Sequence, residues 1–217
     1  MEIEWIQLEG AGAALDGIAA VPDQPTRMPL LMIHENRGLQ PYMLDVAGAL
    51  AEAGHPVVSP DLLSRVGGTS RTSEDPSLTT RAVPPNVHEA DLVAVFDAMV
   101  DRHGKVGVFG FCFGGEMGWR LVTKRTPERA VLFYGIGPDP VDVPSIACPV
   151  YAVYAEDDPR VNDTLPPLCA ALQEAGTDAV LESWPGTKHA FHDHSRPERH
   201  HPDAAAAVWE QALAFLG

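Results

Sequence analysis

The sequence is short of basic residues, of cysteine and of long apolar runs, and each shortage argues against a class of protein. Its 217 residues include 15 basic and 30 acidic side chains, a formal net charge of −15. Such a surface repels polyanions, so neither nucleic acid nor an anionic membrane is expected as a partner. Three cysteines (Cys112, Cys148 and Cys169) at wide, irregular spacing fit neither a disulfide framework nor a zinc site. We expect reduced thiols.

Two further kinds of motif are missing. The opening segment, MEIEWIQLEG, lacks the basic start and the apolar core of an export signal, so we expect a cytoplasmic protein. No GxGxxG dinucleotide motif is present, and Glu116 follows the glycine pair where a Walker A loop has lysine. We therefore expect no cofactor.

Strand-length apolar runs alternate with stretches of helical spacing, which predicts a mostly parallel sheet with helices on both faces. This α/β fold is expected as a single domain over residues 1–217, opening with an antiparallel hairpin in the first 22 residues. The predicted strands cover residues 30–35, 56–60, 105–110, 130–135, 149–156 and 179–186. The predicted helices cover residues 43–54, 88–104, 114–125, 164–176 and 202–217.

One region breaks the alternation. Residues 63–86 are rich in Gly, Ser, Thr and Pro and show no clean period. A connection of this length in a compact domain usually has a function, so the sequence predicts an irregular surface loop near a binding site.

The segment GVFGFCFGGE, residues 107–116, places a cysteine among four glycines between a predicted strand and a predicted helix. Glycine permits a tight turn here, which lifts the side chain of Cys112 off the backbone at the end of the strand. The following helix N-terminus favours a thiolate and, later, an oxyanion. Most free cysteines are simply small buried residues, but this setting favours a nucleophile.

A cysteine nucleophile needs a base and a group that orients the base. In α/β hydrolases these follow the nucleophile in the order acid, then histidine, on loops after later strands. Asp158 follows the strand at 149–156 and His189 follows the strand at 179–186. Asp157 is the near rival of Asp158, and a solvated helix cap is the alternative role for both.

A metal site has to be weighed because five histidines lie between residues 189 and 201. His192 and His194 have the spacing of a ligand pair, but no cysteine or carboxylate clusters with them at ligand spacing. We predict a solvated loop and no metal.

In the motifs GFCFGG, EDDPRV and PGTKHAF, the sequence resembles the dienelactone hydrolase family of α/β hydrolases. The resemblance also includes IHENRGL and SPDLL, runs through nearly the whole chain and keeps the family's motif order. It implies an α/β-hydrolase fold and a triad of Cys112, Asp158 and His189.

The resemblance also implies roles for residues of the IHENRGL motif and for Phe113. Glu35 takes the place of a glutamate that contacts the thiol in the family's resting enzyme and helps to generate the thiolate. The backbone N–H groups of Asn36 and Phe113 would form the oxyanion hole.

The chain departs from the family where the substrate carboxylate is held by two arginines. Asp193 stands at the second arginine's place, although Arg196 and Arg199 follow, and Arg65, Arg71 or Arg81 could supply the first. Dienelactone itself is therefore not the expected substrate. The candidate substrate-binding residues are Arg37, Arg81, Phe111 and Phe191.

The expected function is hydrolysis of a small-molecule ester or enol lactone through a thioester on Cys112, by a monomer or homodimer. An isomerase, cyclase or lyase on the same scaffold is one alternative. A redox-responsive protein with Cys112 as a sensing thiol is the other, although a sensor has no use for an ordered base.

Overall fold

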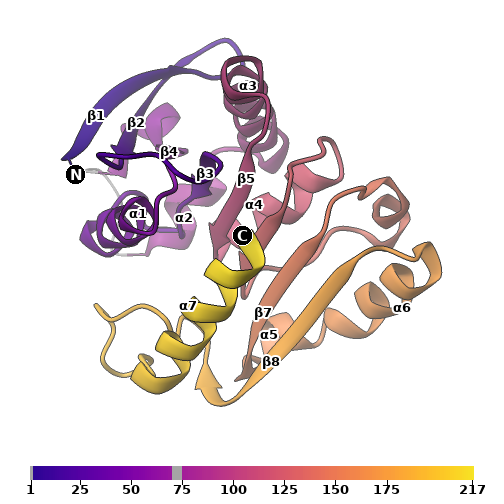
Figure 1. Ribbon diagram of the computed structural model, residues 1–217. Coiled ribbons are helices and arrows are strands. Elements are labelled where there is room, and N and C mark those ends of the chain that lie inside the picture. Colours follow the sequence, from indigo (N-terminus) through magenta and orange to yellow (C-terminus); the bar gives the residue numbers. More distant parts are fainter. Residues whose placement is uncertain (1, 70–74) are drawn as a thin grey trace. The chain divides into compact units, whose positions relative to one another are not determined.

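After three initial strands, strands alternate with helical segments along the described chain, which comprises residues 2–69 and 75–217 of a computed structural model (Figure 1). The chain divides into a first unit, residues 1–107, and a second unit, residues 108–217. The division falls inside an apolar strand rather than in a linker. The single domain expected over 1–217 stays a prediction.

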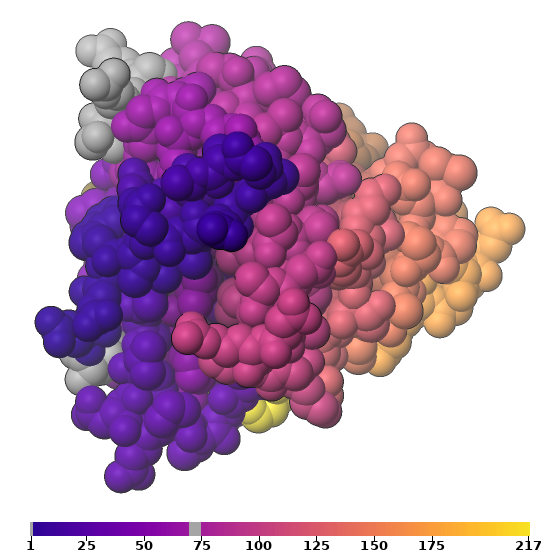
Figure 2. Space-filling view, turned by 90° about the horizontal axis from the view of Figure 1, so that it is seen from above, coloured from indigo at the N-terminus to yellow at the C-terminus, as the bar shows by residue number. Residues whose placement is uncertain are grey.

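The first unit contains a four-stranded sheet in the order β1-β2-β4-β3. Strands β1 (Glu2–Glu9) and β2 (Ala14–Val21) pair antiparallel, which confirms the hairpin predicted for the first 22 residues. Strand β4 (Val57–Pro60) pairs antiparallel with β2 and parallel with β3 (Leu30–Ile33). The hairpin lies at the surface, indigo in Figure 2, where the side chain of Trp5 is 59% exposed.

Helices α1 (Pro41–Glu52) and α3 (Pro85–His103) of the first unit both begin with proline, whose fixed φ suits the first turn of a helix. Gly104 ends α3 with a positive φ. The region 63–86, expected to be irregular, contains the 3-10 helix η1 (Ser64–Val66) and the short helix α2 (Pro76–Arg81). Its residues 70–74 lie outside the described residues.

The second unit contains four parallel strands in the order β5-β6-β7-β8. They are β5 (Gly107–Phe111), β6 (Ala130–Phe133), β7 (Val150–Asp157) and β8 (Ala179–Lys188). Every residue of β5 and β6 is buried, as expected for central strands covered on both faces. The helices are α4 (Phe113–Val122), α5 (Pro159–Asn162), α6 (Leu165–Ala175) and α7 (Pro202–Leu216), with the 3-10 helix η3 (Pro140–Ser145) before β7.

All six predicted strands and all five predicted helices are confirmed, with ends shifted by a few residues. The elements that periodicity did not predict are α2, α5, η1 and η3, which are too short to show a helical repeat. No helix in residues 2–69 and 75–217 has the length and hydropathy needed to cross a lipid bilayer.

Candidate active site

Cys112 occupies a strained turn between β5 and α4. Its φ of 54° and ψ of −111° fall in a region that non-glycine residues rarely adopt, and its side chain is partly exposed. Two backbone hydrogen bonds hold this conformation: the Cys112 N–H donates to the carbonyl of Phe133 at 2.9 Å, and the Glu116 N–H donates to the carbonyl of Cys112 at 3.0 Å. The thiol is thereby held at the carboxyl end of a buried parallel strand.

Two glycines make this turn possible because neighbouring backbones leave no room for a side chain. A Cβ on Gly110 would lie 2.3 Å from the carbonyl oxygen of Gly114. A Cβ on Gly115 would lie 2.5 Å from the carbonyl oxygen of Phe133. Strand β5, helix α4 and strand β6 therefore converge directly behind Cys112.

His189 connects the thiol to a carboxylate. Its Nε2 lies 3.0 Å from the Sγ of Cys112, and its Nδ1 lies 2.5 Å from the Oδ2 of Asp158. Asp158 is 5% exposed, whereas its rival Asp157 is exposed on β7. The structure thus brings together Cys112, His189 and Asp158 in the order of a nucleophile, a base and an orienting acid.

Asp158 also begins α5 as its N-cap residue. Its backbone carbonyl accepts hydrogen bonds from the N–H groups of Val161 and Asn162, while its side chain makes no capping bond. The carboxylate is left for the imidazole of His189. Asp158 therefore stands at the helix N-cap, as the sequence alternative predicted, and its side chain also contacts the imidazole of His189.

Electrostatics favour a charged imidazole at His189. Burial lowers the pKa of His189, but hydrogen bonds to Asp158 and Cys112, with the charges of both, outweigh it and raise the pKa to about 9. These contacts favour the protonated form of the ring. An imidazolium beside Cys112 stabilises a thiolate.

The N-terminus of α4 adds a second favourable field. Phe113 is the first residue of this ten-residue helix, directly after Cys112. The N–H groups of a first helical turn point out of the helix end and carry its positive dipole. Negative charge on the thiolate, or on an oxygen beside it, is stabilised there.

Backbone strain gathers around His189. The described non-glycine residues with positive φ are Cys112, Tyr134 and Ala190. The Tyr134 ring lies 5.0 Å from the His189 ring between centroids, and Ala190 directly follows His189. Tyr134 is 2% exposed, so it supports the imidazole from the protein interior.

Sequence reasoning missed Tyr134, and no motif singled it out. It stands one residue beyond the end of β6, at the sheet edge where catalytic groups of parallel sheets collect. Phe111 and Phe191, both predicted to bind substrate, are fully buried, and each of their rings faces the ring of Tyr134. Their substrate contact stays a prediction.

His192, part of the histidine pair weighed as metal ligands, packs among aromatic rings. Its ring lies 5.4 to 5.6 Å from those of Phe111, Phe133 and Trp209. Burial lowers its pKa to about 4, with help from the positive charges of His200 and His194. Among residues 2–69 and 75–217, no three histidine, cysteine or acidic side chains are grouped to hold a metal ion.

In the first unit, Glu35 is buried and accepts hydrogen bonds from a neighbouring residue. Its Oε1 accepts hydrogen bonds from the backbone N–H of Arg37 at 2.9 Å and from the Nε of Arg37 at 3.2 Å. The Oδ1 of Asn36 is buried, with no hydrogen-bond partner in the described part of the chain. Arg37 therefore neutralises Glu35 rather than standing alone as a substrate cation.

The arginines weighed as the first carboxylate ligand differ in availability. Arg65 donates to both carboxylate oxygens of buried Asp91 and to the carbonyl of Ala11, so it ties η1 to α3. Arg71 lies outside the described residues. Arg81 is exposed in the last turn of α2.

Asp193, which stands where the family has its second arginine, is buried and forms hydrogen bonds and an ion pair. Its carboxylate accepts hydrogen bonds from the backbone N–H of Ser195 at 2.9 Å and from its hydroxyl at 2.6 Å. Arg196 pairs with it at 3.1 Å. The group four residues beyond His189 is therefore an acid, and its neighbouring cation is already paired.

The sheet, the strained turn and the ordered Cys112–His189–Asp158 contacts are those of an α/β hydrolase. The model of the dienelactone hydrolase family matches residues 15–217, nearly the whole chain. The chain belongs to this family, and it is a dienelactone hydrolase-like enzyme. The fold and family inferred from the sequence are confirmed.

Individual relatives agree with this family. A protein of Saccharolobus solfataricus, provisionally named carboxymethylenebutenolidase, is 25% identical over 94% of this chain and 94% of its own length. The carboxymethylenebutenolidase of Rhodococcus opacus is 26% identical, over 86% of this chain and 79% of its own. A crystal structure of a provisionally assigned dienelactone hydrolase from Klebsiella pneumoniae has a TM-score of 0.88 at 24% identity, covering 99% of this chain and 98% of that one.

The charge state of His189 is predicted to depend on Asp158. In Asp158→Asn the amide no longer attracts the imidazolium, so the pKa of His189 falls below the wild-type value of about 9. Titration of the His189 ring by NMR measures this change. Asp157→Asn is the matched control and leaves the pKa unchanged; an equal pKa in wild type and Asp158→Asn would contradict the pairing.

The ring of Tyr134 is predicted to hold His189 in its working orientation. Tyr134→Leu removes the ring contact and lowers kcat/KM on p-nitrophenyl acetate by about 10- to 100-fold, since small misplacements of a catalytic group have such costs. Tyr134→Phe keeps the ring and most of the activity. A folded Tyr134→Leu protein with wild-type kcat/KM and pH profile would show that the contact is only packing.

Proposed function

We propose that the protein hydrolyses a carboxylic ester or an enol lactone through Cys112, His189 and Asp158. The observation that carries the proposal is the chain of contacts from Sγ to imidazole to carboxylate, at 3.0 Å and 2.5 Å, on a strained turn at a helix N-terminus. The family and the relatives named carboxymethylenebutenolidase support the same reaction class.

In the first half-reaction the Cys112 thiolate attacks the carbonyl carbon, and the carbonyl oxygen becomes an oxyanion. The backbone N–H groups of Asn36 and Phe113 would bind this oxyanion, a role that rests on the family resemblance for Asn36 and also on the α4 N-terminus for Phe113. The bond to the leaving alkoxide then breaks, and the His189 imidazolium donates its proton to that oxygen. The products are a thioester on Cys112 and an alcohol or enol.

In the second half-reaction neutral His189, oriented by Asp158, removes a proton from water. The resulting hydroxide attacks the thioester carbonyl, the thiolate leaves, and a carboxylic acid is released. A thiolate leaves a tetrahedral intermediate more readily than an amide nitrogen does. Activated esters and enol lactones are therefore better substrates than amides.

Glu35 is proposed to assist in generating the thiolate, as the family resemblance implies. Its carboxylate is buried, and the hydrogen bonds donated by Arg37 hold it in place. A substrate carboxylate or ester group in this region would compete with Glu35 for the hydrogen bonds that Arg37 donates. Arg37 and Arg81 remain the proposed substrate-binding cations.

The acyl-enzyme provides a direct test. Wild-type protein mixed with p-nitrophenyl acetate and quenched in acid is predicted to carry an acetyl thioester on the peptide that contains Cys112, seen by mass spectrometry. Cys112→Ala loses both the adduct and the turnover.

The control is Cys169→Ala, which removes an exposed thiol and is predicted to keep full activity. The third thiol, Cys148, is inert in this experiment because burial raises its pKa to about 12. Turnover by Cys112→Ala at the wild-type rate would show that the nucleophile has been assigned wrongly. Absence of any turnover on esters and lactones would favour the alternatives: the sensing one if Cys112 is alkylated faster than an ordinary thiol, and the lyase one if it is not.

Substrate charge is predicted to matter. Because Asp193 occupies the second arginine's place and the chain carries a net charge of −15, p-nitrophenyl butyrate is expected to be hydrolysed at least about tenfold faster than mono-p-nitrophenyl glutarate. The measurement is kcat/KM for both esters, in wild type and Arg81→Gln. A preference for the anionic ester that Arg81→Gln abolishes would instead assign carboxylate recognition to Arg81.

A further inference from the structure

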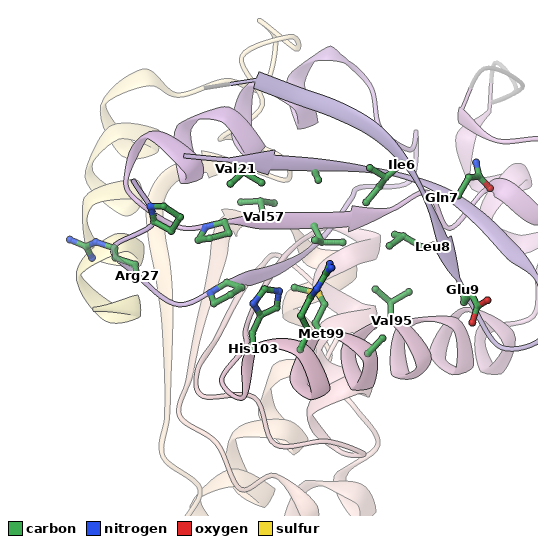
Figure 3. Close-up of a pocket in the computed structure, with 17 residues that line it drawn as sticks. Ile6, Gln7, Leu8, Glu9, Val21, Arg27, Val57, Val95, Met99 and His103 are labelled. Atoms are coloured by element: carbon green, nitrogen blue, oxygen red, sulfur yellow. The ribbon is translucent and has the colours of Figure 1, made fainter. Parts of the chain in front are cut away.

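The two ends of the parallel pair β3 and β4 in the first unit are built differently. At their amino ends, Pro29, Pro56 and Val57 line a mainly apolar groove beside the β1–β2 hairpin (Figure 3). None of the described residues that line this groove is a candidate catalytic residue. At their carboxyl ends, both strands run into turns that are held by buried polar groups. The turn after β3, residues 35–38, is the one that contains Asn36.

This turn uses its backbone N–H groups for its own hydrogen bonds, with one exception. The N–H of Arg37 donates to Oε1 of Glu35 at 2.9 Å, and the N–H of Gly38 donates to the carbonyl of Glu35 at 3.1 Å. Within residues 2–69 and 75–217, the N–H of Asn36 has no hydrogen-bond acceptor. The N–H of Asn36 is therefore left for a bound group.

The carbonyl of the same peptide group contacts the ring of His34, which is fully buried. Nδ1 of His34 lies 2.6 Å from the carbonyl oxygen of Glu35, and Nε2 lies 2.9 Å from the backbone nitrogen of Leu62. A carbonyl oxygen only accepts and a backbone N–H only donates, so Nδ1 carries the ring proton and Nε2 a lone pair. The two contacts thus select one neutral tautomer of His34, in which the ring donates to Glu35.

Holding this carbonyl also sets the direction of the Asn36 N–H. The C=O of Glu35 and the N–H of Asn36 belong to one planar trans peptide, so the two groups point to opposite sides of the chain. The His34 ring and the Gly38 N–H together use both lone pairs of the oxygen. Rotation of the peptide would break both hydrogen bonds within buried structure. The Asn36 N–H is therefore kept on the side away from the His34 ring.

The loop after β4 supports this arrangement at both ends of the turn. At the start, the loop donates a backbone N–H to His34. At the end, the hydroxyl of Thr69 accepts the N–H of Leu39 at 2.8 Å. Asp61, which is 2% exposed, accepts hydrogen bonds from the N–H and the hydroxyl of Thr69, both at 2.7 Å. The position of the turn is therefore fixed by buried polar contacts and not by the turn alone.

We propose that His34 is a positioning residue for ester hydrolysis, which fixes the Glu35–Asn36 peptide so that the Asn36 N–H is directed at the oxyanion formed on the substrate. The inference rests on the proposed function, in which Asn36 supplies one oxyanion donor. A donor that is already held in place needs no rearrangement when negative charge develops, which is the condition for strong electrostatic stabilisation. His34 acts through this peptide and not by contact with the substrate.

The tautomer of His34 gives a test that does not depend on activity. Long-range proton–nitrogen NMR spectra of protein labelled at histidine distinguish a ring nitrogen that carries a proton from one that does not. His34 is expected to be neutral with its proton on Nδ1, and the signals lost in His34→Gln identify the residue. A proton on Nε2, alone or together with one on Nδ1, would overturn the inference whether or not the protein hydrolyses esters.

Kinetics separate the oxyanion from the thiol. His34→Leu is expected to lower kcat and kcat/KM for p-nitrophenyl acetate together by about 10- to 100-fold, the pattern of an interaction made only in the transition state. Alkylation of Cys112 by iodoacetamide forms no oxyanion, so its rate stays at the wild-type value. His34→Gln, whose amide offers one donor and one acceptor, restores most of kcat.

His55→Leu is the matched control. His55 is also fully buried and contacts a backbone carbonyl, that of Met28 at 2.9 Å, but it joins the amino ends of β3 and β4. Its replacement is expected to lower the Tm and to leave kcat and kcat/KM unchanged.

Thr69→Val keeps the test decisive if His34→Leu does not fold. The change preserves the shape of the side chain and removes the hydroxyl that accepts the Leu39 N–H. It is expected to lower kcat by about 3- to 10-fold, the effect of one hydrogen bond. Circular dichroism establishes that each variant is folded.

The inference is overturned if folded His34→Leu or Thr69→Val has the wild-type kcat, or if alkylation of Cys112 slows in proportion to ester hydrolysis. A wild-type protein that shows neither ester turnover nor a thioester on Cys112 would overturn the proposed function itself, and the role of His34 in hydrolysis with it. The two failures are distinguished by the wild-type activity alone.

Discussion

Three backbone segments approach one another behind Cys112 more closely than any side chain permits, and the proposed chemistry depends on this approach. A Cβ on Gly135 would lie 2.2 Å from the carbonyl carbon of Gly115, and Gly110 is similarly closed by Gly114. Because β5, β6 and α4 meet without intervening side chains, the turn between β5 and α4 has only Cys112 in it. The thiol is therefore presented at a helix N-terminus, with its backbone strained.

Similar backbone strain is found at three residues around His189. Cys112, Tyr134 and Ala190 have left-handed backbones, and residues of this kind persist only where surrounding structure over-determines them. Here that structure is the buried parallel sheet and the aromatic cluster beneath its edge, which includes Phe111, Phe133 and His192. The imidazole is thus oriented before substrate arrives, by Asp158 on one side and a ring on another.

The acidic side chains discussed above are paired one by one with basic groups. Three acids are engaged individually: Asp158 with His189 and Asp193 with Arg196 in the second unit, and Glu35 with Arg37 in the first. A paired carboxylate attracts a substrate cation less strongly, and a substrate anion that binds a paired arginine has to compete with the acid already bound to it.

The sequence by itself determined the alternation of strands and helices, the hairpin, the tight turn at Cys112 and the chain order of nucleophile, acid and histidine, because all of these depend on local periodicity and glycine placement. Only the tertiary structure brought Asp158 rather than Asp157 to His189, since adjacent residues at a strand end point in opposite directions. The tertiary structure also pairs Arg65 with Asp91, 26 residues away, and packs the ring of Tyr134 against that of His189. Such pairings join segments that are remote along the chain, so no local pattern could have predicted them.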